Sequence, residues 1–319
     1  MSVLAKLYDS AFSGRDDWRS MVTADSAWNL SHPFNALSGA DAIERDWLVP
    51  LQAAMGDVER RPLIEFNGDS DGRPWSAGTG YFLGSFNAPF LGIAPTGKSL
   101  YLRYSELVRY EDDRVAEMYL WVDVLDAMHQ AGVYPLREPL GHSGLILGPA
   151  SSDGLNPPDL GAEHAAQSVQ LIMDMLDGLR QYDGVSLESM PLADFWDSDF
   201  MWFGPGGIGT TRGIDGFRAH HQGPFLQGFP DRDVDHHACT LACGDYVATG
   251  GWPHMHGTHS GDGWLGLPAS GVQLELRVMD IWRREGAMLK ENWVAIDIPH
   301  MLLQMGIDIF NQESEAKRA

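Results

Sequence analysis

The sequence is poor in cysteine. Cys239 and Cys243 are the only two thiols among 319 residues. Two cysteines cannot supply the disulfide framework that is typical of small secreted domains. A Cys-x3-Cys pair without partners elsewhere is also a weak pattern for a metal site. The composition therefore favours two ordinary free thiols and excludes the disulfide-rich class of protein.

Basic residues and long apolar runs are scarce as well. The 22 Lys and Arg residues are outnumbered by 44 Asp and Glu residues, which gives a formal net charge of −22. A protein that binds phosphate groups needs a basic face, so nucleic acid and membrane surfaces are poor partners for this chain. No run of about 18 apolar residues occurs, and the first residues are polar where a signal peptide would need an apolar core. We therefore expect a cytoplasmic protein.

The chain does contain a long internal repeat. Residues 174 positions apart agree at many points along the sequence (297 − 123 = 174). Solenoid repeats have periods of roughly 20 to 50 residues, so each copy here must be a domain with its own core. We predict a first domain at 1–134, a linker rich in proline and glycine at 135–162, and a second domain at 163–319. The matched pairs include Gly39/Gly213, Pro50/Pro224, Arg103/Arg277, Arg109/Arg283, Glu117/Glu291, Asp123/Asp297, Gln130/Gln304 and Gly132/Gly306.

Each copy begins with helical patterns and continues with alternating ones. A second helix is predicted from Gly39 to about residue 55 and from Gly213 to about residue 226, although Pro50 and Pro224 should kink or end these helices. Apolar and polar residues then alternate, which predicts antiparallel hairpins followed by a short helix that stops at glycine. The predicted strands are 100–110, 115–123, 274–283 and 289–297, and the short helices are 124–130 and 298–304. Helices followed by strands are an α+β pattern.

Two stretches of the second copy carry a family resemblance. They are GTHSGDGWLGLPASG at 257–271 and LKENWVAIDIPHMLLQMG at 289–306, and looser versions occur at 84–98 and 115–132. The sequence resembles the SnoaL-like polyketide cyclase group of the nuclear transport factor 2-like superfamily. This resemblance implies two tandem cone-shaped α+β barrels, in which helices close over a curved antiparallel sheet and leave a blind apolar pocket. It also implies an intramolecular pseudo-dimer formed through the sheets, with a further homodimer left open.

The same resemblance implies an acid–base aspartate directly before the last helix. Asp297 matches this position in the second copy and Asp123 in the first. Alternation puts Glu291 and Trp293 on the strand face of Asp297, and burial in an apolar pocket would bring the pKa of a carboxyl group toward neutral pH. The alternative is that both aspartates cap the following helix. The residues predicted to line the pockets are Trp202, Asp280, Glu291 and Trp293 in the second copy and Tyr119, Trp121 and Asp123 in the first.

Histidine distinguishes the two copies, because the second copy has many histidines at positions where the first has other residues. His254 and His256 are two apart on a predicted strand and should share a face. One of the helical pair His220 and His221 should point into the same cavity. A neutral imidazole there passes a proton or polarises a carbonyl. Two alternatives stay open, namely a divalent metal site and a polar rim without chemistry.

These patterns favour an enzyme that performs acid–base chemistry on a small apolar carbonyl compound in the second-domain pocket, as a cyclase, isomerase or dehydratase. Asp297 would move the proton, His254, His256 or His220 would orient the carbonyl, and Trp202 and Trp293 would form walls. We predict neither a metal nor a cofactor, since the resembled family works without them. The alternatives are a non-catalytic binding or dimerisation module and a His-ligated metal enzyme.

Overall fold

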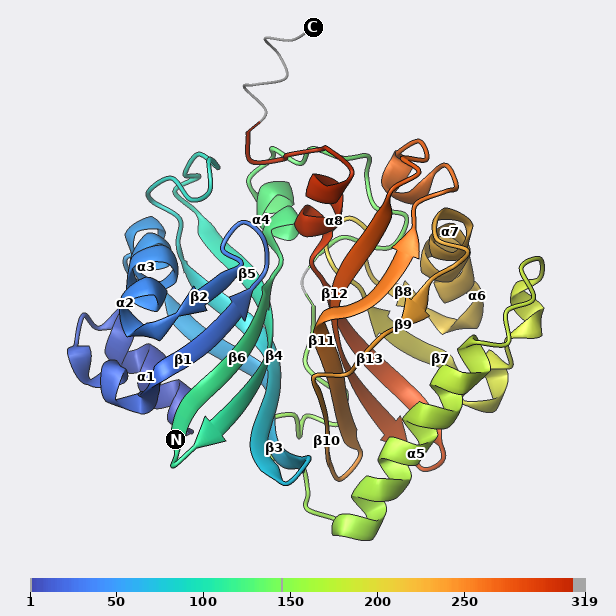
Figure 1. Ribbon diagram of the computed structural model, residues 1–319, viewed down its shortest axis with the longest axis horizontal. Coiled ribbons are helices and arrows are strands. Elements are labelled where there is room, and N and C mark those ends of the chain that lie inside the picture. Colours follow the sequence, from blue (N-terminus) through green and yellow to red (C-terminus); the bar gives the residue numbers. More distant parts are fainter. Residues whose placement is uncertain (1, 145, 312–319) are drawn as a thin grey trace, which may run out of the picture.

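Two curved β-sheets with helices on their outer faces form the molecule. The computed structural model describes residues 2–144 and 146–311. Figure 1 shows the two sheets meeting along the centre, with helices on the far side of each sheet and two short helices side by side at one end of the contact. The architecture is the mixed α+β class predicted from the order of patterns, with one sheet of 6 strands and one of 7. Among the described residues, no helix is long and apolar enough to cross a membrane.

The first domain is defined here by the six-stranded sheet and its helices. Its strand order is β2-β1-β6-β5-β4-β3, with β1 parallel to β6 and the other pairs antiparallel. The strands are β1 (Val22–Leu30), β2 (Ala36–Ser38), β3 (Glu59–Ser70), β4 (Arg73–Ser85), β5 (Ser99–Glu111) and β6 (Arg114–Val122). The helices are α1 (Val3–Phe12), α2 (Gly39–Ile43), α3 (Val49–Ala54) and α4 (Val124–Gln130).

The second domain repeats this plan around the seven-stranded sheet. The order is β10-β11-β12-β13-β7-β8, and β9 pairs with β11. The strands are β7 (Trp196–Phe203), β8 (Thr211–Arg212), β9 (Asp233–Val234), β10 (Cys239–Cys243), β11 (Tyr246–Thr258), β12 (Gln273–Glu285) and β13 (Met288–Ile296). The helices are α5 (Ala162–Leu179), α6 (Gly213–Phe217), α7 (Gly223–Gly228) and α8 (Ile298–Gln304).

The long hairpins follow from alternation and from their turns. In the β5–β6 turn, Asp112 and Asp113 both have positive φ angles, of 49° and 58°. Two successive left-handed residues are typical of the tight turns whose twist suits antiparallel strands. At the matching turn between β12 and β13, Gly286 takes a φ of 60°. The acidic and glycine-containing turns expected from the sequence therefore close both hairpins.

Pro50 and Pro224 do not end the helices in which they lie, and each follows a short π-helical turn. In the first domain the helical segment runs from α2 through a π-helical turn, Glu44–Leu48, into α3. In the second domain a π-helical turn, Arg218–Gln222, joins α6 to α7 in the same way. Pro50 and Pro224 lie in the first turn of α3 and α7, where a missing N–H is tolerated because the preceding turn is wider. The second π-helical turn carries His221 toward the candidate site.

The sheet faces away from the helices pack against each other. A buried cluster at this contact combines residues of both sheets and of the segment between the domains. It contains Ile64, Phe66, Trp75, Leu107 and Trp121 from the first domain, Ile146 from the connecting segment, and Phe203, Leu241, Met279, Trp293 and Ala295 from the second. Each sheet is consequently buried on both faces, one against helices and one against the other sheet.

Candidate active site

The strand face that carries Glu291, Trp293 and Asp297 points toward the first domain. The Trp293 indole stacks on Phe203 with ring centroids 5.2 Å apart and donates a hydrogen bond to the Leu147 carbonyl oxygen at 2.8 Å. Glu291 is ion-paired with Arg283 and accepts a hydrogen bond from the Ala150 N–H at 3.0 Å. Glu291 and Trp293 therefore lie at the domain interface, not in the pocket where alternation suggested placing them.

Asp297 holds a helix end and the other domain at once. Its Oδ1 accepts a hydrogen bond from the His300 N–H at 3.1 Å, which caps α8. Its Oδ2 accepts from the His32 N–H of the first domain at 2.9 Å and from Arg277 at 3.0 Å. Burial raises the pKa of Asp297 to about 6, and the Arg277 guanidinium opposes that rise. The surroundings of Asp297 are those of a capping and interface residue.

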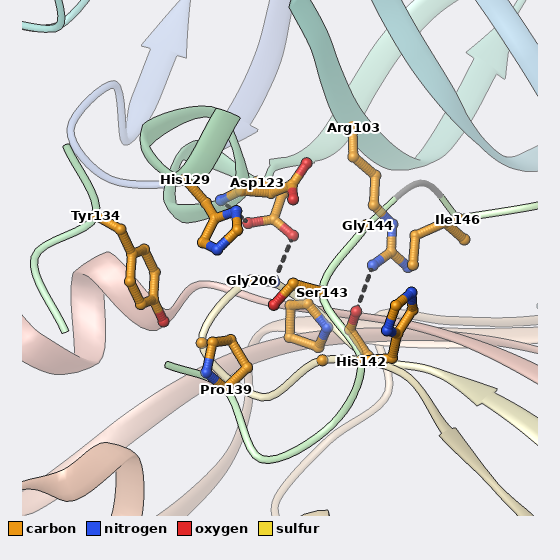
Figure 2. A pocket seen from close by; sticks show the side chains of 15 residues that line it. Arg103, Asp123, His129, Tyr134, Pro139, His142, Ser143, Gly144, Ile146 and Gly206 are labelled. Carbon is orange, nitrogen blue, oxygen red and sulfur yellow. Dashed lines mark hydrogen bonds between the residues drawn. The ribbon is translucent and has the colours of Figure 1, made fainter. Parts of the chain in front are cut away.

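Asp123 makes the corresponding contacts from the first domain. Its Oδ1 caps α4 by accepting from the Asp126 N–H at 3.0 Å, and its Oδ2 accepts from the Gly206 N–H at 2.7 Å. Gly206 is the repeat partner of His32 (32 + 174 = 206). Figure 2 shows the Asp123 carboxylate reaching the glycine-rich loop of the second domain beside Arg103. A side chain at Gly206 would meet Asp123 Oδ1 at 2.7 Å, so glycine permits this approach.

The hollow around Asp123 in Figure 2 is small. It has a volume of about 20 Å³, which is room for about one water molecule. Trp121 is buried in the interface cluster, and Tyr119 packs beside it, with ring centroids 6.3 Å apart. The Tyr119 hydroxyl donates to Glu117 at 2.5 Å. The first-domain residues that were expected to line a pocket thus lie along the contact between the two sheets.

A large cavity lies on the opposite face of the second sheet. Its volume is about 660 Å³, and it is enclosed by α5, the segment from α6 to α7, and the helix-covered face of the sheet. Side chains of β12 and β13 at even-numbered positions line it, next to the odd-numbered positions that face the first domain. The central lining residues are Trp196, Trp202, Phe217, His221, Gln222, Phe225, Arg232, His254, Asp280, Trp282, Asn292 and Val294. This volume suits a small organic molecule.

Asp280 is the carboxylate of the cavity wall. Its side chain is half-buried and lines the cavity. Burial raises the pKa of Asp280 to about 7, while a hydrogen bond from Asn292 Nδ2 to Oδ1, at 3.1 Å, opposes the rise. The other two lining carboxylates, Asp177 and Asp233, are 71% and 64% exposed at the rim. Asp280 is therefore the lining acid whose protonation changes near neutral pH.

Three histidines, His221, His237 and His254, line the cavity with Asp280, and burial lowers the pKa of His221 and His254 most strongly. His221 stacks on Trp202 with ring centroids 4.1 Å apart, and burial, with a smaller effect of Arg232, lowers its pKa to about 3. Burial also lowers the pKa of His254 to about 3, and its Nδ1 finds no hydrogen-bond partner among the described residues. Since both rings are uncharged at neutral pH, each has one N–H to donate and one nitrogen to accept. They can orient a carbonyl group without carrying charge.

His220 and His256 do not lie in the cavity. His220 is exposed on the outer side of the π-helical turn, which presents the adjacent His221 inward instead. His256 is paired with Asp235, Nδ1 to Oδ1 at 2.6 Å. The strand β11 has a register shift between Gly251 and Met255, and a bulge of this kind re-aims the side chains that follow. Because of this irregularity, His254 and Met255 both line the cavity while His256 does not.

The corresponding interior of the first domain is filled. Glu106 stands at the repeat position of Asp280 (106 + 174 = 280) and is ion-paired with the buried Arg60. Arg60 also reaches Glu65 at 2.7 Å. The fully buried aromatic side chains around this pair are Tyr8, Trp28, Trp47, Phe82 and Tyr104. Glu106 in the first copy is thus ion-paired and surrounded by aromatic side chains, whereas Asp280 in the second copy faces the cavity.

Position-by-position comparison of the two copies could have located the wall of the cavity, which the number of histidines alone does not. Asn292 stands where the first copy has Met118 (118 + 174 = 292), and His221 stands where it has Trp47 (47 + 174 = 221). Polar residues at positions that are apolar in the filled copy mark the wall of the cavity.

A metal site was the other interpretation of the histidines. Residues 2–144 and 146–311 contain no group of three or more His, Cys, Asp and Glu side chains that could hold an ion.

Part of the second domain matches a known family model. Residues 188–292 match the family model described as a SnoaL-like domain. The matched segment includes Trp202, His221, His254, Asp280 and Asn292 and ends before Asp297. No curated protein is similar enough in sequence to count as a relative.

Three solved structures are similar to parts of the chain. A proposed SnoaL-like polyketide cyclase of Jannaschia sp. CCS1 is 21% identical, covers 42% of this chain and 90% of its own, and has a TM-score of 0.34. IdmH, a proposed polyketide cyclase of Streptomyces antibioticus, is 21% identical over 41% of this chain and 96% of its own, with a TM-score of 0.35. An NTF2-like protein of Burkholderia thailandensis E264 is 18% identical, covers 41% of this chain and 94% of its own, and has a TM-score of 0.32.

Replacing Asn292 with Leu should raise the pKa of Asp280 further. The amide donates to the carboxylate, and a hydrogen bond to the charged form lowers a pKa. We expect an increase of about one unit above the value in the wild-type protein. Carbon-13 NMR of labelled aspartate, assigned with an Asp280→Asn sample, measures the titration directly. An unchanged midpoint would mean that Asn292 does not stabilise the ionised carboxylate.

Proposed function

We propose that the second-domain cavity is the active site of an enzyme that moves a proton next to a carbonyl group in a small, largely apolar molecule. The observation that carries the proposal is Asp280, a carboxyl group with a pKa of about 7 facing a cavity of about 660 Å³. General bases work best when their pKa lies near the operating pH. The aromatic lining, including Trp202 and Trp282, suits a flat ring system.

In the proposed reaction the ionised Asp280 takes a proton from the carbon beside the carbonyl. The C–H bond breaks, the proton passes to a carboxylate oxygen, and the electron pair moves to the carbonyl oxygen as an enolate. A ring N–H of His254 or His221 would donate to that oxygen as its charge develops. Asn292 holds the carboxylate in place. Return of the proton to another carbon gives isomerisation, and attack of the enolate on a second carbonyl gives cyclisation.

Hydrogen–deuterium exchange of 1-tetralone, a neutral bicyclic ketone, tests this proposal. In D2O the wild-type protein should exchange the protons beside the carbonyl faster than buffer does, with saturation at high ketone concentration. Because the base must be ionised, the rate should increase as the pH rises and level off above a midpoint of about 7. Tight binding of the ketone without exchange above the buffer rate would instead favour the non-catalytic binding module.

A further inference from the structure

We propose that the molecule bound in this cavity carries a single carboxylate group, and that Arg232 receives it. The inference rests on the proposed function, because it assigns the substrate class of the same cavity. It makes the substrate a small amphipathic acid with a carbonyl group, oriented by its charged end.

Arg232 is a lining guanidinium without a carboxylate partner. It lies in the wall of the cavity, just before β9. Among the described residues its side chain donates to the Leu179 carbonyl oxygen at 3.3 Å and lies over the Tyr182 ring at 5.9 Å, and no carboxylate oxygen is close enough for an ion pair. Most arginines of this acidic chain have an acidic partner, as Arg180 has in Asp177 at 2.9 Å. A buried or half-buried cation without such a partner is costly.

Arg232 lies close enough to the cavity wall to act on it electrostatically. Burial lowers the pKa of Arg232, so the protein keeps this cation partly desolvated. Its positive charge also lowers the pKa of His221, which stacks on the wall residue Trp202. Arg232 and His221 both line the cavity, so the charge of Arg232 reaches the aromatic wall against which a ligand would lie.

The filled copy has no cation at the position equivalent to Arg232. Val58 stands at the repeat position of Arg232 (58 + 174 = 232) and is buried, with 6% exposed. The backbone agrees, because the Val58 N–H donates to the Met55 carbonyl oxygen and the Arg232 N–H donates to that of Phe229, which is the partner of Met55 (55 + 174 = 229). The arginine is thus present in the copy with the cavity and replaced by an apolar residue in the copy without it.

A carboxylate fits this position better than a doubly charged anion. The planar guanidinium binds a carboxylate through two parallel hydrogen bonds. Asp177 and Asp233 stand at the same rim, and together with the net charge of −22 they disfavour a phosphate monoester, because the other lining arginine, Arg180, is already paired with Asp177. The rest of the lining is largely apolar, which suits the remainder of an amphipathic acid.

Binding of 2-naphthylacetate and 2-naphthylacetamide, which differ in charge at one end, tests the inference. Calorimetry on the full chain should show the acid binding at least about tenfold more tightly than the amide, as expected for charge-assisted hydrogen bonds. In Arg232→Gln the two affinities should become equal through loss of acid binding, with the amide affinity kept within about twofold of wild type. Arg212→Gln, which removes an exposed arginine outside the cavity, is the control for net charge and should keep the wild-type preference.

Equal binding of the two probes by the wild-type protein, or an undiminished preference in Arg232→Gln, would overturn the inference. If Arg232→Gln no longer binds the amide, Arg232→Met takes its place and is judged by the same ratio. Failure of the proposed function is distinguishable, because 1-tetralone exchange by the wild-type protein uses no carboxylate on the ligand. Acid preference without exchange would refute the proton transfer alone, and exchange without acid preference would refute the Arg232 site alone.

Discussion

Asp280→Asn is expected to slow the exchange of 1-tetralone by about 10² to 10⁴-fold, the range of a lost general base. The amide has nearly the shape of the carboxyl group but cannot accept the proton. Binding of the ketone should persist within a few-fold, since the aromatic walls of the cavity remain. Steady-state NMR exchange over a series of ketone concentrations separates the rate from the affinity.

The matched control is Asp177→Asn, which removes a carboxylate that is 71% exposed at the rim of the same cavity. It should leave the exchange rate within about twofold of wild type, because Asp177 stands at the solvent-exposed rim and not in the enclosed wall where the carbonyl group would bind. Equal losses in the two variants would show that the rate follows the charge of the cavity as a whole. Wild-type activity in Asp280→Asn would remove Asp280 from the reaction.

Asp280→Asn should also change how the stability of the protein depends on pH. Burial raises the pKa of Asp280 from 3.8 to about 7, so the folded protein binds this proton more tightly than the unfolded chain. The resulting stabilisation is complete below about pH 4 and is lost as the pH rises through about 7. Asp280→Asn has no such proton to lose. Its free energy of unfolding, relative to that of the wild-type protein, should therefore rise between about pH 5 and pH 8, by about 1.4 kcal/mol for each pH unit up to the folded-state pKa. Urea unfolding at both pH values measures the difference, and a gain that does not depend on pH would contradict it.

Asp297→Ala is expected to lower the free energy of unfolding by roughly 3 kcal/mol or more. The change removes the cap of α8 and the bond from His32, and it leaves the largely buried Arg277 without its carboxylate. Because Asp297 lies at the domain interface, the exchange rate per folded molecule should stay within about twofold of wild type. Urea unfolding, followed by exchange measured under folding conditions, gives both quantities.

Asp123→Ala is the natural comparison for this variant. Asp123 has the same cap and the same type of interdomain bond, but Arg103 donates to the carbonyl oxygens of Phe203, Gly204 and Val294 and keeps its partners. The loss of stability should therefore be smaller, about 1 to 2 kcal/mol.

A strong loss of exchange in folded Asp297→Ala would contradict the purely structural role of Asp297. It would return the catalytic role to this residue, as the family resemblance implied.

The alternation of residues in β12 and β13 was enough to predict the hairpins and the short helix that follows them. It did not identify the strand face that lines the cavity. In a sheet with one face in solvent, the apolar face is evident from the sequence. Here Trp293 and Ala295 are buried against the first domain, and Val294 and Ile296 face the cavity, so both faces carry apolar residues. The choice between Asp280 and Asp297 depended on this ambiguity.

The cavity includes His254 and His221 but not His256 or His220, and the reason is local. A regular strand would have put His254 and His256 on one face, and a regular α-helix gave no preference between His220 and His221. The bulge in β11 and the π-helical turn before Pro224 altered both patterns. Such irregularities come from long-range packing and from the backbone constraints of proline, and a period of two or 3.6 does not contain them.

The sequence by itself determined the repeat, the α+β order of elements and the pairing of equivalent aspartates, because these depend on local patterns and on identity at a fixed spacing. Only the tertiary structure decided that Asp123 and Asp297 bind the two domains together, that Glu106 is enclosed by rings and paired with Arg60, and that Asp280 faces open space. The physical reason is that a side chain acquires its burial, its partners and hence its pKa from residues far away in the chain.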